Sequence, residues 1–217
     1  VPAMPEASVT RYSVLPRLGE FTSPFEIIGD DSLTVNSGNC PMNARSSGTQ
    51  MLQAYFVFDV STADSTNYVA GLYNNYCGLL AADGTVTLPE PLILGGLPMG
   101  PSAGAPTTLQ CPGTDALVGL YGVLGRAGAM TPTSRKRIFG IGLVCAPLPA
   151  WLDTAVMAPS RRSPLIGVTP AQMANVRDVE MPASICDRNQ VVVGLAAARV
   201  DGLGAIKPVC GRVTVTR

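Results

Sequence analysis

The chain has 217 residues, of which 47% are hydrophobic and 14% charged, and its 15 basic and 15 acidic side chains give a formal net charge of zero. A chain of this length can bury about 70% of its unfolded surface, and its composition excludes a disordered protein. The balanced charge disfavours sequence-independent binding to nucleic acid, so no nucleic-acid partner is expected. Histidine is absent, which excludes Ser-His-Asp and Cys-His catalytic sites.

Strands dominate the predicted elements. A short apolar run that opens with Pro and ends in Gly occurs at 24–29, 91–95 and 164–167, and each run is typical of a short strand with a turn. Aromatic and β-branched residues predict longer strands at 53–60, 116–121, 191–195 and 212–216. Asp-Gly pairs mark turns at 83–84 and 201–202.

Short helices are expected only near 150–157 and, behind a Thr-Pro pair, at 171–176. Trp151 falls in the first of these segments. Aromatic side chains contribute first as buried area, so packing between repeats is the favoured role for Trp151 over a ligand platform.

The spacing of six cysteines divides the chain into three units. Cys40 precedes Cys111 by 71 residues and Cys111 precedes Cys186 by 75, while the intervening cysteines at 77, 145 and 210 are 68 and 65 residues apart. A threefold repeat of this length predicts one domain over 1–217, with repeats at about 22–88, 89–158 and 159–217.

Matching offsets support the repeat. In the second and third units a Gly-Leu pair, at 119–120 and 194–195, follows the first Cys at eight and nine residues. The closing Cys of both units is preceded by Ile at four residues and Val at one residue. The first unit is looser because it carries an insertion rich in Asn, Ser and Thr.

The repeat selects one disulfide pattern from the 15 that six cysteines allow. Pairing within each unit joins Cys40 to Cys77, Cys111 to Cys145 and Cys186 to Cys210, with separations of 37, 34 and 24 residues. No Cys-x-x-Cys pair is present, which argues against a zinc site, and we expect no metal and no cofactor.

Paired cysteines indicate an oxidising compartment. The opening sequence Val-Pro-Ala-Met-Pro has neither an initiator Met nor an apolar signal segment, which is consistent with a secretory signal already removed. The chain contains no run of about 18 apolar residues, the length that a membrane-spanning helix requires, so no membrane span is expected. The expected location is therefore extracellular or on the cell surface.

Three similar β units can each form a sheet, and three sheets can pack around a pseudo-threefold axis. This arrangement is an all-β fold, a β-prism of three repeats with one disulfide each. A β-trefoil is the competing architecture, although its units are shorter, at about 40–50 residues.

One motif carries a family resemblance. Cys111-Pro112, then Val118-Gly119-Leu120, then Ile141-x-Leu143-x-Cys145 is echoed in the third unit between Cys186 and Cys210. This pattern resembles the repeat of vitelline membrane outer layer protein I and related bacterial jacalin-like β-prism domains. The resemblance extends from about Pro24 to Cys210, and it implies a β-prism and a lectin-like function.

The resemblance also implies where a sugar would bind. Jacalin-like lectins bind sugar hydroxyls with a Gly-rich loop and an Asp-bearing loop, and the nearest counterparts here are Gly95-Gly96 and Asp30-Asp31. The second unit departs from the vitelline-type pattern, because Thr131–Arg137 replaces the acidic, Asn-containing turn that usually precedes the closing strand.

Three groups of residues are candidates for ligand contacts. Tyr73, Asn74, Asn75 and Tyr76 combine amide groups with aromatic faces suited to a sugar, or else form a turn with tyrosines that pack on the sheet. Asp30 and Asp31 are either ligands for hydroxyls or calcium, or solvated turn residues. Basic clusters at 135–137 and 161–162 are either contacts for an anionic glycan or solvated loops.

Two functions follow from these features. The first is a secreted, lectin-like carbohydrate-binding module whose partner is a glycan or polysaccharide. The alternative is a structural subunit of an extracellular or cell-surface assembly, such as a coat, sheath or pilus-associated layer, that contacts copies of itself or other surface proteins through segments such as 97–106. An enzyme is not expected, because the acidic residues form no recognisable catalytic pattern.

Overall fold

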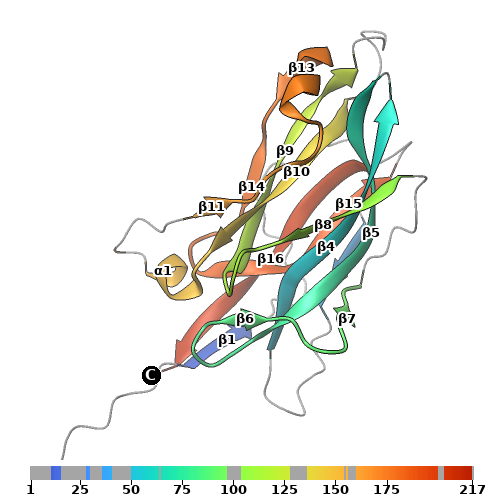
Figure 1. Ribbon diagram of the computed structural model, residues 1–217. Helices are drawn as coiled ribbons and strands as arrows, with labels where there is room; N and C mark the ends of the chain where they lie inside the picture. The colour runs from blue at the N-terminus through green and yellow to red at the C-terminus, as the bar shows by residue number, and fades with distance from the viewer. Residues whose placement is uncertain are drawn as a thin grey trace, which may run out of the picture.

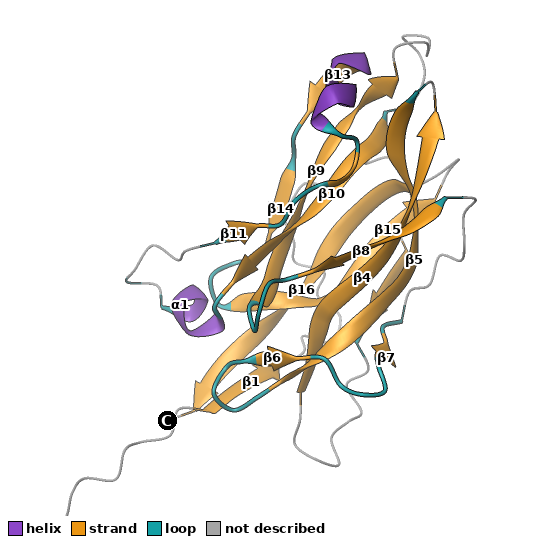
Figure 2. Cartoon of the chain, viewed as in Figure 1, coloured by secondary structure: helices purple, strands orange, loops and turns teal. Residues whose placement is uncertain are grey.

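A computed structural model describes residues 11–15, 28–29, 36–40, 50–63, 65–96, 104–127, 136–153, 155, 160–199 and 203–216 (Figure 1). Their strands form three antiparallel sheets, and two short helices, α1 (Leu148–Leu152) and the 3₁₀ helix η2 (Pro170–Asn175), lie at opposite ends of the molecule (Figure 2). Among these residues no helix is long and apolar enough to cross a membrane.

A long hairpin forms the centre of each sheet. In chain order the hairpins are β4 (Gln50–Ala63) with β5 (Thr66–Leu80), β9 (Ala116–Ala127) with β10 (Arg137–Ala146), and β15 (Gln190–Arg199) with β16 (Leu203–Thr216). We call the sheets built on them the first, second and third sheet. These strands contain the four long strands that the sequence predicts, and the predictions are confirmed.

Short strands cover both edges of each hairpin. The first sheet adds β6 (Val86–Thr87) and β7 (Ile93–Leu94) beside β5, and β8 (Ala105–Gln110) beside β4. The second adds β11 (Arg161–Arg162) and β12 (Ile166–Gly167) beside β10, and β13 (Val176–Glu180) and β14 (Ala183–Ile185) beside β9. The third adds β1 (Arg11–Leu15) and β2 (Ile28–Gly29) beside β16, and β3 (Asn36–Asn39) beside β15.

The first and second sheets therefore have Greek-key connectivity, in which the chain leaves the hairpin, pairs with its second strand and returns beside its first. The three predicted Pro-to-Gly strands are confirmed, because β2, β7 and β12 all pair with the second strand of a hairpin. In the third sheet the covering strands come from the N-terminal part of the chain.

The sheets are offset from the sequence units. We expected each unit to form one sheet, but the strands that open a unit pair with the hairpin of a different unit. For example, β7 and β8 lie in the second unit and complete the first sheet. The three sheets form a β-prism in which neighbouring units share sheets.

The three predicted disulfides are present, and each joins two sheets. Cys40 follows β3 of the third sheet and bonds Cys77 on β5 of the first sheet. The Cys111–Cys145 bond joins the end of the first sheet to β10 of the second, and the Cys186–Cys210 bond joins the end of the second sheet to β16 of the third. The bonds thus lie within sequence units but between sheets.

A bulge occurs at the same register in all three hairpins. In each pair of strands the residue opposite the closing cysteine is followed by one extra residue, which is Ala54, Val118 or Val193. This shared irregularity, together with the cysteine positions, shows the pseudo-threefold relation of the hairpins. Residues can therefore be compared position by position between the sheets.

The core lies between the sheets. Phe56, Leu120 and Leu195 occupy equivalent positions two residues after the bulge, and each is 0% exposed in one cluster. A second cluster contains residues of all three sheets and Trp151, which is 6% exposed. The Trp151 indole N–H donates to the carbonyl of Gln190 at 2.8 Å, so its predicted packing role is confirmed.

The predicted helices are present with shifted ends, as α1 and η2. The turn at Asp83-Gly84 is also confirmed, with Gly84 at φ 86° and its N–H donating to the Ala81 carbonyl. The Asp83 carboxylate accepts hydrogen bonds from the Thr85 N–H and hydroxyl, and these bonds lower the pKa of Asp83. The predicted turn at 201–202 lies outside the described residues.

Removing one inter-sheet bond with Cys186→Ala/Cys210→Ala should lower the free energy of unfolding by about 3–4 kcal/mol, because the bond restricts the unfolded chain. Urea denaturation monitored by circular dichroism measures this loss. The matched variant Cys111→Ala/Cys145→Ala, which opens a bond of longer sequence separation, should lose about as much. Peptide mapping under non-reducing conditions that finds any other pairing would contradict the arrangement.

Candidate functional site

The outer face of the first sheet carries a row of side chains that crosses four strands. The strand register places Leu94 of β7 opposite Tyr76 of β5, Tyr76 opposite Tyr55 of β4, and Tyr55 opposite Gln110 of β8. Their neighbour Phe56 points into the core, so alternation along the strand directs Tyr55 outward. We call Leu94, Tyr76, Tyr55 and Gln110 the tyrosine row.

The row combines aromatic, apolar and amide groups. The rings of Tyr55 and Tyr76 are 5.3 Å apart between centroids and tilted by 45°. Leu94 is 56% exposed and Gln110 is exposed. Asn74, two residues before Tyr76 on the same face, donates from Nδ2 to the Tyr76 hydroxyl at 3.2 Å. This bond holds the Tyr76 hydroxyl in place at the surface of the sheet.

The row breaks the pseudo-threefold symmetry. At the position of Tyr55 the other two hairpins have Gly119 and Gly194. A Cβ on Gly119 would lie 2.6 Å from the carbonyl oxygen of Ser184, and one on Gly194 would lie 2.6 Å from that of Gly38. The covering strands therefore exclude side chains at these two positions, while β8 leaves room for Tyr55.

Of the four predicted residues at 73–76, the structure brings two into this face. Asn74 and Tyr76 are partly exposed and point outward. Tyr73 is the extra residue of a bulge between the pairs Val57–Asn74 and Phe58–Leu72, and it is 39% exposed. Asn75 points into the interior and is 1% exposed. We therefore leave Asn75 out of the candidate site.

Gly95 and Gly96 lie next to the row, at the junction with the third sheet. The Gly95 N–H donates to the Asn75 carbonyl at 2.7 Å, and the Gly96 N–H donates to the Asn39 carbonyl at 3.3 Å. Gly95 is buried and Gly96 is exposed, which leaves Gly96 as the more accessible of the two. The predicted candidates Asp30 and Asp31 lie outside the described residues.

Two buried amides lie behind the row. Gln53 is 0% exposed, and the nitrogen and oxygen of its side chain, like those of Asn75, have no hydrogen-bond partner. A Cβ on Gly95 would lie 2.7 Å from the Gln53 Nε2, so glycine allows this close approach. The second hairpin has Leu117 and Leu143 at the positions of Gln53 and Asn75.

Sequence reasoning missed Tyr55, Leu94 and Gln110 as site residues. The sequence correctly predicts a strand at Tyr55, but residue types alone do not report that strand's partners and register. A signal was present: where the second and third units have Gly-Leu, the first has Tyr55-Phe56. Gln110 carried no signal, since a lone glutamine before a cysteine is an ordinary residue of a solvated strand edge.

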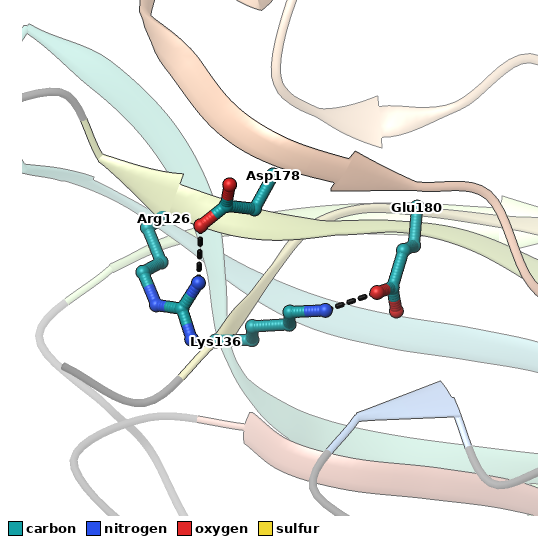
Figure 3. A network of polar contacts seen from close by, with 4 residues as sticks. All are labelled: Arg126, Lys136, Asp178 and Glu180. Atoms are coloured by element: carbon teal, nitrogen blue, oxygen red, sulfur yellow. Dashed lines mark hydrogen bonds and ion pairs between the residues drawn. The ribbon is translucent and has the colours of Figure 1, made fainter. Parts of the chain in front are cut away.

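The basic clusters are largely occupied by contacts within the chain. Lys136 pairs with Glu180, and Arg137 stacks over the Tyr68 ring at 5.1 Å (Figure 3 shows the ion pair). Arg162 lies 4.8 Å from the centroid of the Tyr121 ring. Arg135 lies outside the described residues.

Tyr121 lies beneath Arg162 on the second sheet. Burial raises the pKa of Tyr121, and the positive charge of Arg162 opposes this shift. The Tyr121 hydroxyl donates to the carbonyl of Ser163. Arg162 and Tyr121 thus stabilise the outside of the second sheet, and Arg162 is not an isolated surface charge.

The β13 edge of the second sheet has features that discourage pairing with another chain. Arg126 pairs with Asp178 and Lys136 with Glu180 (Figure 3). Asp178 has φ 51°, and the register shifts between Arg177 and Glu180. Charged side chains and a bulge of this kind are the usual protection of an exposed strand edge.

Within the described part of the chain, no group of three or more His, Cys, Asp or Glu side chains is placed to hold a metal ion. The tyrosine row offers aromatic faces and amide groups at the surface of the sheet. Aromatic faces accept apolar C–H groups, and amides donate and accept hydrogen bonds.

Comparison with known proteins concerns the fold. No family model and no curated protein matches the chain. Among solved structures, the chain is similar to artocarpin in a complex with mannotriose, at 9% identity and a TM-score of 0.46 over 87% of this chain and 95% of that one. It is also similar to a mannose-binding jacalin-related lectin from Ananas comosus, at 10% identity and a TM-score of 0.45 over 86% and 95% of the two chains.

A third similar structure is single-chain recombinant jacalin, at 9% identity and a TM-score of 0.46 over 89% of this chain and 98% of that one.

Replacing one buried amide by Gln53→Leu should raise the free energy of unfolding by about 1–2 kcal/mol, because an unsatisfied buried amide is removed. The urea midpoint measures the change. The matched variant Leu117→Gln places the amide at the equivalent position of the second hairpin and should destabilise the protein. A destabilising Gln53→Leu would mean that the amide is satisfied in the folded protein.

Proposed function

We propose that this protein is a secreted, lectin-like carbohydrate-binding protein and that the tyrosine row is its binding surface. The observation that carries the proposal is the partly exposed Tyr55–Tyr76 pair, which lies between Leu94 and Gln110 on one sheet and is replaced by small or aliphatic residues on the others. A glycan or polysaccharide is the partner.

A sugar and this row are chemically complementary. One side of a pyranose ring is lined by C–H groups, which pack on aromatic and aliphatic faces such as those of Tyr76 and Leu94. The sugar hydroxyls at the rim of the ring both donate and accept hydrogen bonds, as do the amide of Gln110 and the tyrosine hydroxyls.

The row is rigid before a ligand arrives. Tyr55 and Tyr76 lie on the two central strands of the sheet, and their backbones are paired on both sides. The Asn74–Tyr76 hydrogen bond fixes one ring further. Little side-chain freedom is then lost on binding, which favours affinity on a surface that offers few contacts.

Disulfides at the three sheet junctions support an extracellular or cell-surface location. Each bond is buried or half-buried and joins two different sheets. Structural bonds of this type form and persist in oxidising compartments. Cell-surface or environmental polysaccharides are the carbohydrates that a protein in such a compartment meets.

The alternative function, a structural subunit that assembles through strand edges, has weaker support. Val179 and Met181 are 42% and 59% exposed beside the β13 edge. That edge also carries the bulge and ion pairs described above, and the β8 edge contains Pro106. Charge, bulges and proline all oppose pairing between edges.

The natively oxidised protein should bind a subset of an array of glycans and cell-wall polysaccharides, and Tyr76→Ala should weaken binding about tenfold, since stacking contributes about 1 kcal/mol or more. Titration calorimetry with the best array ligand measures the change. Tyr55→Ala should cause a similar loss.

Tyr73→Ala is the matched control, because Tyr73 lies on the same strand but is displaced from the row by the bulge. Its affinity should stay within about twofold of the wild-type value. Equal losses in Tyr73→Ala and Tyr76→Ala would place the site elsewhere, and silence of the oxidised protein across the array would refute carbohydrate binding.

A further inference from the structure

A half-open pocket of about 220 Å³ adjoins the tyrosine row at its β8 end. Gln110 belongs to both, because it lies opposite Tyr55 on β8 and also lines the pocket. Ala54, the bulge residue that precedes Tyr55, lines the pocket as well. A ligand that covers Tyr55 therefore lies next to the pocket.

The pocket is bordered by three segments of the chain. These are the bulge of β4, the segment from β6 to Leu88, and the turn that follows β8, and the lining includes Ala54, Val86, Thr87, Leu88 and Thr114. The Val86 N–H donates to the Thr114 carbonyl at 3.2 Å. This backbone bond joins β6 to the turn, so the borders of the pocket are held in place by the fold itself.

The pocket has room for a part of a ligand. Sites that bind a drug-sized molecule by themselves have volumes of about 300–1,000 Å³ and bury most of its surface. This pocket is smaller and is open on one side. It is therefore suited to one substituent of a molecule whose remainder lies outside, on the tyrosine row.

The residue at the bulge distinguishes the first hairpin from the other two. At the position of Ala54 they have Val118 and Val193. Alanine lacks the branched methyl groups of valine, and the smaller side chain leaves space beside Tyr55. The pocket and the tyrosine row thus occur on the same hairpin and depart from the same repeat.

The lining is mainly apolar, with polar groups at a few positions. Ala54, Val86 and Leu88 present methyl groups. A sugar hydroxyl placed against these methyl groups would lose hydrogen bonds to water, which is unfavourable. Gln110 presents an amide that both donates and accepts hydrogen bonds. The lining therefore matches a substituent with an apolar end next to a hydrogen-bonding group.

An acidic substituent matches the lining poorly. No Lys or Arg is among the lining residues, and Asp115 adds a negative charge. The carboxylate of an acidic sugar would thus find no cation and would be repelled. An acetamido group is neutral, and it carries a methyl group beside an N–H donor and a C=O acceptor. Both of its parts have counterparts in the lining.

We propose that the pocket holds the acetamido group of an N-acetylated sugar whose ring lies on the tyrosine row. The methyl group packs against Ala54, Val86 and Leu88, and the amide forms hydrogen bonds with the side chain of Gln110. This inference rests on the proposed carbohydrate-binding function and adds the ligand class, which is glycans that contain acetamido sugars.

The test compares oligosaccharides that share one linkage and differ at one ring position. The β-1,4-linked tetramers of N-acetylglucosamine, glucose and glucosamine carry an acetamido group, a hydroxyl or an ammonium group there, and titration calorimetry measures each affinity. Ligand-observed NMR compares N-acetylated and unmodified monosaccharides of the gluco, galacto and manno series, so the result does not depend on one sugar.

Four variants separate the pocket from the row. Ala54→Val fills the pocket with the residue of the other two hairpins, Leu88→Ala removes apolar surface from it, and Tyr76→Ala removes a ring from the row. The matched control is Leu92→Ala, because Leu92 is 45% exposed on the connection from β6 to β7 and lies outside both the pocket and the row. Thermal melts confirm that each variant is folded.

We expect the acetylated tetramer to bind at least about tenfold more tightly than the other two. Ala54→Val should lower its affinity to about that of the glucose tetramer, because the space for the methyl group is filled. Leu88→Ala should reduce the preference for the acetylated tetramer at least about threefold through lost apolar contact. Leu92→Ala should leave the preference within about twofold, and Tyr76→Ala should weaken the acetylated and glucose tetramers equally.

The outcomes distinguish the pocket from the proposed function. Equal affinities for acetylated and unmodified sugars in every series, lost in Tyr76→Ala, would overturn the pocket and leave carbohydrate binding standing. A preference for the acetylated tetramer that persists in Ala54→Val would do the same. Tighter binding of the glucosamine tetramer would overturn the assignment of the pocket to an acetamido group. No binding of any sugar by any form of the protein would refute both proposals.

Discussion

The three long hairpins each present two open edges, and the whole fold depends on how those edges are covered. An uncovered edge leaves a line of backbone N–H and C=O groups without partners. The chain covers each edge with a short strand from the segment that follows, and it covers the last hairpin with β1, β2 and β3 from its beginning. The three sheets thus depend on one another in a closed circle.

The disulfides lie at the same junctions. Cys40, Cys111 and Cys186 each come directly after a covering strand, and each bonds the second strand of the hairpin in the next sheet. The covalent bond and the strand pairing therefore act at one place, where the chain passes from one sheet to another. Long-range pairing in the third sheet, between the two ends of the chain, is the step that completes the circle and the one with the greatest loop-closure cost.

Much of the fold could be predicted from the sequence because its signals are local. Pro and Gly delimit β2, β7 and β12, and β-branched and aromatic residues mark the hairpin strands. The similar spacing of the cysteines in the three units predicted which cysteines form disulfide bonds with each other. The sequence did not reveal that the strands opening one unit complete the sheet of another unit. Alternation of apolar and polar residues along a strand indicates which face of the sheet each residue lies on, but it does not indicate which strand lies beside it.

The candidate site was only partly predictable for the same reason. The segment 73–76 looks uniform in sequence, but the bulge at Tyr73 and the alternation that follows direct Asn75 inward and Tyr76 outward.

The residues of the first hairpin differ from those at equivalent positions of the other two hairpins, and they differ on both faces of the sheet. On the outer face Tyr55 replaces glycine, and on the inner face Gln53 and Asn75 replace the leucines of the second hairpin. Two buried amides without partners reduce stability, and the aromatic pair beside them is only partly buried. Natural sequences depart from the most stable choice mainly where function requires it. The coincidence of these departures in one hairpin is thus an independent physical reason, free of any fold analogy, to place the binding surface on the first sheet.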